Sequence, residues 1–149
     1  MFSDTIRKIL LSAFLTMFAA APFALPQTVP QPARVAKHHT VFQMSEAEAE
    51  WSPLIAHVTN LMNALEHDGG VDVEVVFFGE GINMVRRSNT KFAESMRSLA
   101  DRGVVFAACQ NSMRSRQIKS EDLFPFAIEV DSGVAELTRK QEAGWAYIK

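Results

Sequence analysis

The sequence is poor in the residues that crosslink or ligate. It contains 1 cysteine in 149 residues, so no disulfide can form within the chain. The adjacent His38 and His39 diverge along an extended strand, and His57 and His67 are too far apart for one helix face, so we expect no metal site. A G-x-S-x-G elbow, a Walker A loop and a paired-carboxylate motif are all missing, which disfavours the common hydrolases and NTPases.

The sequence also lacks a large excess of charge of either sign. The chain has 15 basic and 17 acidic residues, for a net charge of −2. This balance excludes the basic surface of a dedicated nucleic-acid-binding protein. With 48% hydrophobic residues the chain can build a core, and its length suits one domain.

The first segment has the pattern of a secretory signal peptide, which we place at residues 1–26. Arg7 and Lys8 precede a short apolar run that ends in small residues. Ala21 and Ala24 are alternative cleavage positions, and Pro22 makes neither of them ideal. The run is too short for a stable membrane span, although an uncleaved signal would anchor the protein. We therefore expect an exported, periplasmic protein with a flexible leader at 27–36 and a folded domain at 37–149.

The rest of the chain alternates between strand and helix patterns. Ser45-x-x-Glu48 matches a capping box and Ser52-Pro53 offers a second helix start, whereas the later helices are expected to open at residues 88–90, at Asn111 and at residues 131–132. The strands are predicted at residues 39–43, 71–78, 104–108, 127–130 and 145–148. Strands joined by helices run parallel, so the sequence predicts a three-layer α/β domain with a central, mostly parallel five-stranded sheet.

Two features follow strands whose carboxyl ends meet at one edge of that sheet, where parallel sheets bind ligands. The first is Cys109, at the end of the most apolar strand. Amides near Asn111 and the cation of Arg114 would stabilise its thiolate, which is the nucleophilic form of cysteine. The alternative is that Cys109 is a small buried hydrophobic residue.

The second feature is the loop Gly79-Glu80-Gly81. It resembles the start of a dinucleotide-binding fingerprint, but Met84 stands in place of the third glycine and Glu80 would repel a phosphate. We interpret Gly79 and Gly81 as a sharp turn that shapes the rim of a pocket beside Cys109. No cofactor is expected.

Three segments together resemble one protein family. They are Val75–Ile82 (VVFFGEGI), the run from Gly103 to Met113 (GVVFAACQNSM) followed by Asp122-Leu-Phe-Pro125, and the ending from Ser132 to Lys149. The chain is similar to the exported branch of the DsrE/DsrF-like family over roughly residues 37–149.

The resemblance implies a flavodoxin-like fold, a homo-oligomer and sulfur-relay chemistry. In related sulfur-relay proteins of the TusD/DsrE type, a cysteine after the third strand carries sulfane sulfur as a persulfide, and Cys109 occupies that position. The implied partners are a sulfane donor and a thiol-bearing protein, for either a carrier or a sulfurtransferase. The alternative is a non-catalytic module, either small-ligand-binding or oligomeric, in which Cys109 is structural.

Overall fold

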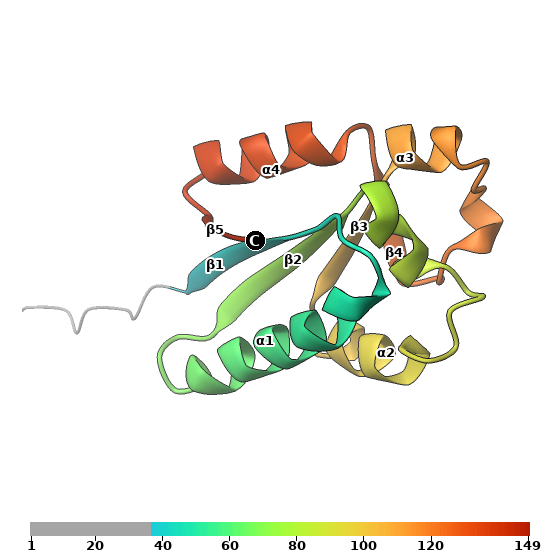
Figure 1. The fold of residues 1–149 in the computed structure, drawn as a ribbon. Coiled ribbons are helices and arrows are strands. Elements are labelled where there is room, and N and C mark those ends of the chain that lie inside the picture. The colour runs from blue at the N-terminus through green and yellow to red at the C-terminus, as the bar shows by residue number, and fades with distance from the viewer. Residues whose placement is uncertain (1–36) are drawn as a thin grey trace, which may run out of the picture. The chain divides into compact units, whose positions relative to one another are not determined.

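The computed structural model describes residues 37–149, and the predicted signal peptide (1–26) and leader (27–36) lie outside them. Five parallel strands form one sheet in the order β4-β3-β2-β1-β5 (Figure 1). The strands are β1 (His38–Met44), β2 (Val71–Phe77), β3 (Val105–Cys109), β4 (Ala127–Val130) and β5 (Ala146–Ile148).

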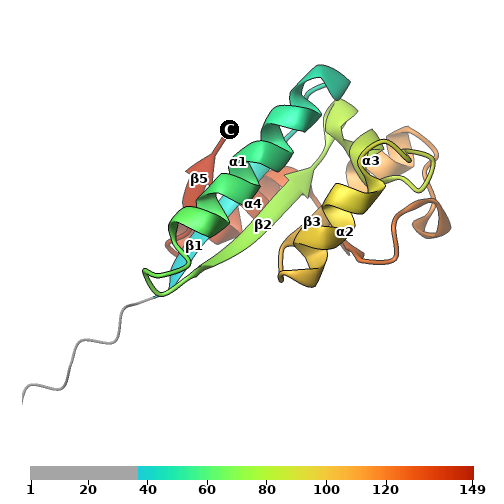
Figure 2. The ribbon, with the colours of Figure 1, turned by 90° about the horizontal axis from the view of Figure 1, so that it is seen from below.

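Helices cover both faces of the sheet. α1 (Trp51–Ala64) and α2 (Ala93–Asp101) lie on one side, and α4 (Gly133–Glu142) and α3 (Gln110–Ser115) lie on the other (Figures 1 and 2). Short 3-10 helices η1 (Glu48–Glu50), η2 (Gly79–Val85) and η3 (Ser120–Asp122) complete the connections. The predicted three-layer, flavodoxin-like α/β fold is confirmed.

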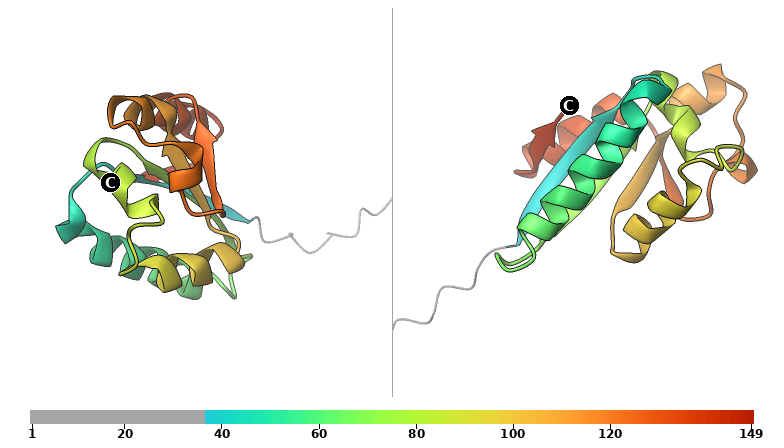
Figure 3. Two further views of the ribbon diagram at one scale, coloured as in Figure 1. Left: turned by 90° about the vertical axis from the view of Figure 1, so that its right-hand side faces the viewer. Right: turned by 60° about the horizontal axis from the view of Figure 1, so that its bottom comes forward.

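The strand order contains a reversal. The chain steps outward from β1 to β4, and α4 then carries it back to β5 on the opposite side of β1 (Figure 3). The carboxyl ends of β1 and β5 therefore flank a topological switch point, which is the usual ligand position in open parallel sheets.

The two faces of the sheet bury very different amounts of apolar surface. The core under α1 and α2 includes the large, fully buried Phe77, Phe106 and Met96. Within residues 37–149, the core under α4 contains only four buried members, with Phe78, Val130 and Trp145 packed around them. The four are Val41, Val76, Ala107 and Leu137. Since apolar burial drives folding, most of the stabilisation comes from the α1–α2 side.

The sheet and the main helices match the sequence prediction, whereas most predicted helix caps are wrong. Ser45 does not cap a helix: its hydroxyl accepts from Gln43 and its amide donates to Glu46. The Asn89 side chain donates a hydrogen bond to the Met84 carbonyl and does not cap α2, whose N-cap is Phe92. The cap at the start of α4 is confirmed, because the Ser132 hydroxyl accepts from the Ala135 amide.

Within residues 37–149, no helix is long and apolar enough to cross a membrane.

Candidate functional site

Cys109 ends β3 and immediately precedes α3. It is the last strand residue and also the N-cap of that helix, so the strand passes directly into the helix at this residue. Ala107 and Ala108 before it are small and buried, and β3 lies between β2 and β4, away from the sheet edge. The Cys109 residue itself is 4% exposed.

The thiol lies among hydrogen-bond donors. Burial by itself would raise the pKa of Cys109, but donors around the sulfur outweigh this effect and the net pKa is lowered. The donors are the backbone amides of Gly133, Ser112 and Asn111 and the hydroxyl of Ser112. Because these groups stabilise an anion at the sulfur, the site favours the thiolate.

Ser112 connects Cys109 to the loop after β2. Its Oγ accepts a hydrogen bond of 3.0 Å from the Gly79 amide and can donate its own hydrogen to the sulfur. The role of the Ser112 hydroxyl was not predicted from the sequence. Its position three residues after a strand-ending cysteine, within the first turn of a helix, was the available signal.

Gly133 brings the first turn of α4 against the same sulfur. A Cβ at this position would lie 3.3 Å from the Cys109 Cβ and 2.9 Å from the Phe78 Cδ1. Only a glycine therefore fits here without displacing a neighbour. Sequence reasoning missed Gly133 too, because its partner lies on another strand and no local pattern reveals the contact.

The two glycines predicted at the rim have different surroundings. Gly79 has a positive φ of 54° and donates to Ser112, so it belongs to the Cys109 site. Gly81 packs instead against β1, where an added Cβ would lie 2.2 Å from the Met44 carbonyl oxygen. Gly81 thus permits close approach of two backbones, as expected of a turn.

The predicted polar neighbours are placed as follows. The Asn111 amide faces the sulfur, but the Asn111 side chain accepts a hydrogen bond from the Arg114 guanidinium and does not cap α3. Arg114 is exposed and lines a shallow hollow with Lys119 and Glu129, among others. The donors that act most strongly on the thiol are amides and a hydroxyl, not cations.

Glu80 and Arg116 form an ion pair of 2.7 Å between the loop after β2 and the end of α3. The ion pair connects the same two segments as the hydrogen bond between Gly79 and Ser112. It also neutralises the carboxylate that the sequence analysis expected to repel anions.

Among the described residues, no group of three or more His, Cys, Asp or Glu side chains could hold a metal ion.

Comparisons with known proteins agree with this architecture. The model of the DsrE/DsrF-like family matches residues 32–149. The solved structure of MTH1491 from Methanobacterium thermoautotrophicum, a protein of unknown function, is 35% identical with a TM-score of 0.70, covering 75% of this chain and 98% of that one. The YchN protein from E. coli is 13% identical with a TM-score of 0.60, covering 76% of this chain and 98% of that one. No curated protein matches the sequence significantly.

Proposed function

Because the chain belongs to the DsrE/DsrF-like family, which is generally tied to sulfur relay, we propose that Cys109 carries sulfane sulfur as a persulfide. Cys109 accepts the sulfur from a donor and passes it to a thiol on a partner protein. The observation that carries this proposal is the set of four hydrogen-bond donors around a thiol whose pKa is lowered.

The reaction is two successive displacements at sulfur. The Cys109 thiolate attacks the outer sulfur of a donor R–S–S⁻, a new S–S bond forms, and R–S⁻ leaves with the electron pair of the broken bond. The product is Cys109–S–S⁻. A partner thiolate then attacks the outer sulfur, the bond to Sγ breaks, and Cys109 returns as a thiolate. No external oxidant or reductant is consumed.

The same donors serve both anionic forms of the site. They stabilise the attacking thiolate before transfer and receive negative charge again when Cys109 leaves in the second step. Backbone amides of α3 and α4 are fixed in direction by their helices, so they need little rearrangement as charge appears.

Access to the sulfur requires local movement. Gly133 and Phe78 pack closely together beside Cys109, whose residue is 4% exposed. Because the first turn of α4 packs on Cys109, we infer that this turn moves when a sulfur donor reaches Sγ.

Intact-mass spectrometry after incubation with inorganic polysulfide tests the proposal. We expect the wild type to gain one sulfur atom, dithiothreitol to remove it, and Cys109→Ser to gain none. Equal uptake by Cys109→Ser would contradict the proposal. A thiol that neither gains sulfur nor reacts with iodoacetamide until the protein is denatured would favour the alternative of a binding module with a structural Cys109.

We also propose that the protein is exported to the periplasm and assembles as a homo-oligomer. The basic and apolar pattern of residues 1–26 supports export. Exposed apolar side chains on β4, α4 and β5 (Ile128, Val134 and Tyr147) are suitable for subunit contacts. Cell fractionation with mass measurement of the N-terminus tests the first proposal, and multi-angle light scattering tests the second.

A further inference from the structure

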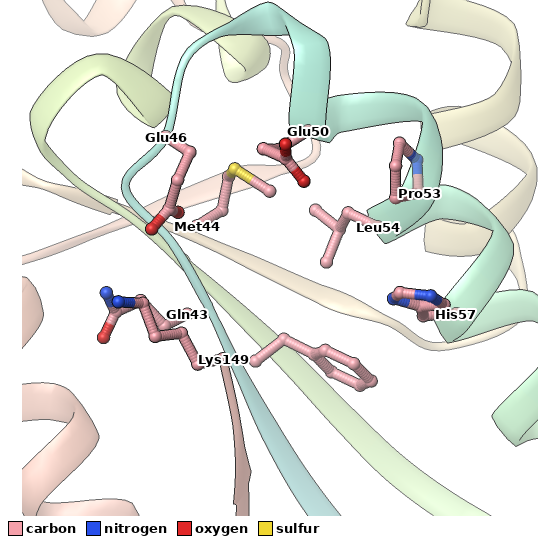
Figure 4. Close-up of a pocket in the computed structure, with 9 residues that line it drawn as sticks. Gln43, Met44, Glu46, Glu50, Pro53, Leu54, His57 and Lys149 are labelled. Carbon is pink, nitrogen blue, oxygen red and sulfur yellow. The ribbon is translucent and has the colours of Figure 1, made fainter.

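A hollow of about 290 Å³ opens at the switch point between β1 and β5, and Cys109 does not line it. The lining residues come from the end of β1, the segment that follows it, the first half of α1 and the residue after β5 (Figure 4). They are Phe42, Gln43, Met44, Glu46, Glu50, Pro53, Leu54, His57 and Lys149. This is where open parallel sheets bind ligands, and the volume is at the small end of the range for ligand pockets.

The base of the hollow is apolar and firmly held. Phe42, Met44 and Leu54 belong to the large core under α1, with exposed fractions of 3%, 4% and 4%. Their exposed edges offer a fixed apolar surface to a compact ligand. Pro53 and His57 extend this wall along α1 (Figure 4).

Two carboxylates give the hollow its electrostatic character. Glu46 and Glu50 project toward it from the segment between β1 and α1 (Figure 4). Burial opposes ionisation of Glu46, but hydrogen bonds from Ser45 and the charge of Lys149 outweigh it and lower the pKa of Glu46. Glu46 is therefore ionised at neutral pH. Glu50 has no ion-pair partner within residues 37–149.

The charges favour a cationic ligand. The charge of Lys149 acts on Glu46, but these two side chains form no ion pair, so Glu46 and Glu50 are both available to a ligand. An anion would meet two carboxylates and a single ammonium group. A bare metal ion would find too few ligands, since no three candidate ligand side chains converge in the described residues, and it would gain nothing from the apolar wall.

We propose that this hollow binds a small organic amine in its protonated form. The ammonium group donates charge-assisted hydrogen bonds to Glu50 and Glu46, and a compact apolar or aromatic body packs on Phe42 and Leu54. The hollow does not include Cys109, so this proposal does not depend on whether Cys109 carries sulfur.

An NMR titration of the full chain, labelled with ¹⁵N, tests the proposal with three probes of one shape. Benzylamine is the cation, benzyl alcohol the neutral control and benzoate the anionic control. We expect benzylamine to shift the amides of residues 42–57 and 149. It should bind at least about 10-fold more tightly than either control, as one charge-assisted hydrogen bond provides.

Matched variants locate the charge that is recognised. Glu50→Gln should weaken the binding of benzylamine about 10-fold. Glu46→Gln should weaken this binding as well. Glu142→Gln, an exposed carboxylate at the end of α4, and Cys109→Ser should leave binding unchanged. The proposal would be overturned if benzoate bound as tightly as benzylamine, or if Glu50→Gln left the affinity for benzylamine unchanged. Amide shifts centred on other residues, or no saturable binding of benzylamine, would also overturn it.

Discussion

The backbone amide of Gly133 helps to lower the pKa of the Cys109 thiol, which brings the start of α4 against the end of β3. The contact is close because residue 133 has no side chain, and Phe78 occupies the space beside it. The helix that returns the chain to β5 thus also supplies a donor to the sulfur. Substitutions at this junction should affect packing and thiol chemistry together.

Gly133→Ala should destabilise the protein by about 1–3 kcal/mol, the usual cost of overpacking. The new methyl group would lie 2.9 Å from Phe78 Cδ1 and 3.3 Å from Cys109 Cβ, so the first turn of α4 must move. Urea unfolding measures the loss. Val134→Ala is the control, because Val134 is 63% exposed and its truncation should change the free energy of unfolding by less than about 0.5 kcal/mol.

Ser112→Ala should lower stability by about 1–2 kcal/mol and slow sulfur loading of Cys109. The variant removes the acceptor of the Gly79 amide and one donor to the sulfur. Ser115→Ala is the matched control, since the exposed Ser115 hydroxyl only donates to the Ser112 carbonyl. Equal loading rates in the two variants would show that the Ser112 hydroxyl does not act on the thiol.

The rate of Cys109 alkylation by iodoacetamide should rise with pH around a midpoint below about 8.5, the ordinary pKa of a free thiol. The structure lowers this pKa through amide and hydroxyl donors, which outweigh burial. The same cysteine in urea-denatured protein is the reference and should titrate near its ordinary value. A native midpoint at or above the denatured one would contradict the donor arrangement.

The same pKa shift makes stability depend on pH in a defined direction. Because the pKa of Cys109 is lowered on folding, its contribution to the free energy of unfolding is fully present above the unfolded pKa and is lost as pH falls through the folded pKa. Cys109→Ser should remove this dependence. Urea unfolding of both proteins between about pH 6 and 9.5 measures the difference.

Lys140→Met should destabilise the protein by about 2 kcal/mol at neutral pH, because it leaves the carboxylate of Glu74 buried without its partner. Lys140 Nζ lies 2.6 Å from Glu74 Oε2, whereas Glu74 Oε1 has no hydrogen-bond partner among the described residues. The expected loss is below that of a fully buried pair, since the Lys140 side chain is 22% exposed. Lys91→Met is the control, because its pair with Glu48 is exposed and contributes little.

The effect of Lys140→Met should shrink in acid. Burial raises the pKa of Glu74 despite the opposing effect of Lys140, so the contribution of this carboxyl to stability is present below the unfolded pKa and is lost as pH rises through the folded pKa. Removing Lys140 raises the pKa of Glu74 in the folded protein further, so the stability lost in Lys140→Met increases toward neutral pH. Urea unfolding at about pH 4 and pH 7 checks this, and a deficit that grew in acid would contradict it.

The sheet could be predicted from sequence because its strands are short apolar runs bounded by turns. The prediction at residues 127–130 coincides with β4, and Cys109 was expected at the end of β3, where the structure places it. Periodicity and burial act locally, so a single sequence reveals them.

The surroundings of Cys109 could be predicted only in part, since they depend on contacts between distant segments. The amide of Asn111 lies two residues after the cysteine and was expected, whereas Gly133 reaches the sulfur only through the crossover of α4. The helix caps were wrong for a related reason. Ser45 and Asn89 form hydrogen bonds with Gln43 and Met84 instead, and capping patterns do not anticipate such competition.

The unequal cores on the two faces of the sheet imply unequal resistance to transient opening. The amides of α1 and β2 are held by a large apolar cluster, whereas α4 rests on a small one. In native-state hydrogen exchange, α4 should therefore exchange through a partial opening of lower free energy than the global transition. Thermal fluctuation would then uncover the end of β3 intermittently while the rest of the domain stays folded, and the frequency of these openings would set an upper limit on how fast a reagent reaches Cys109.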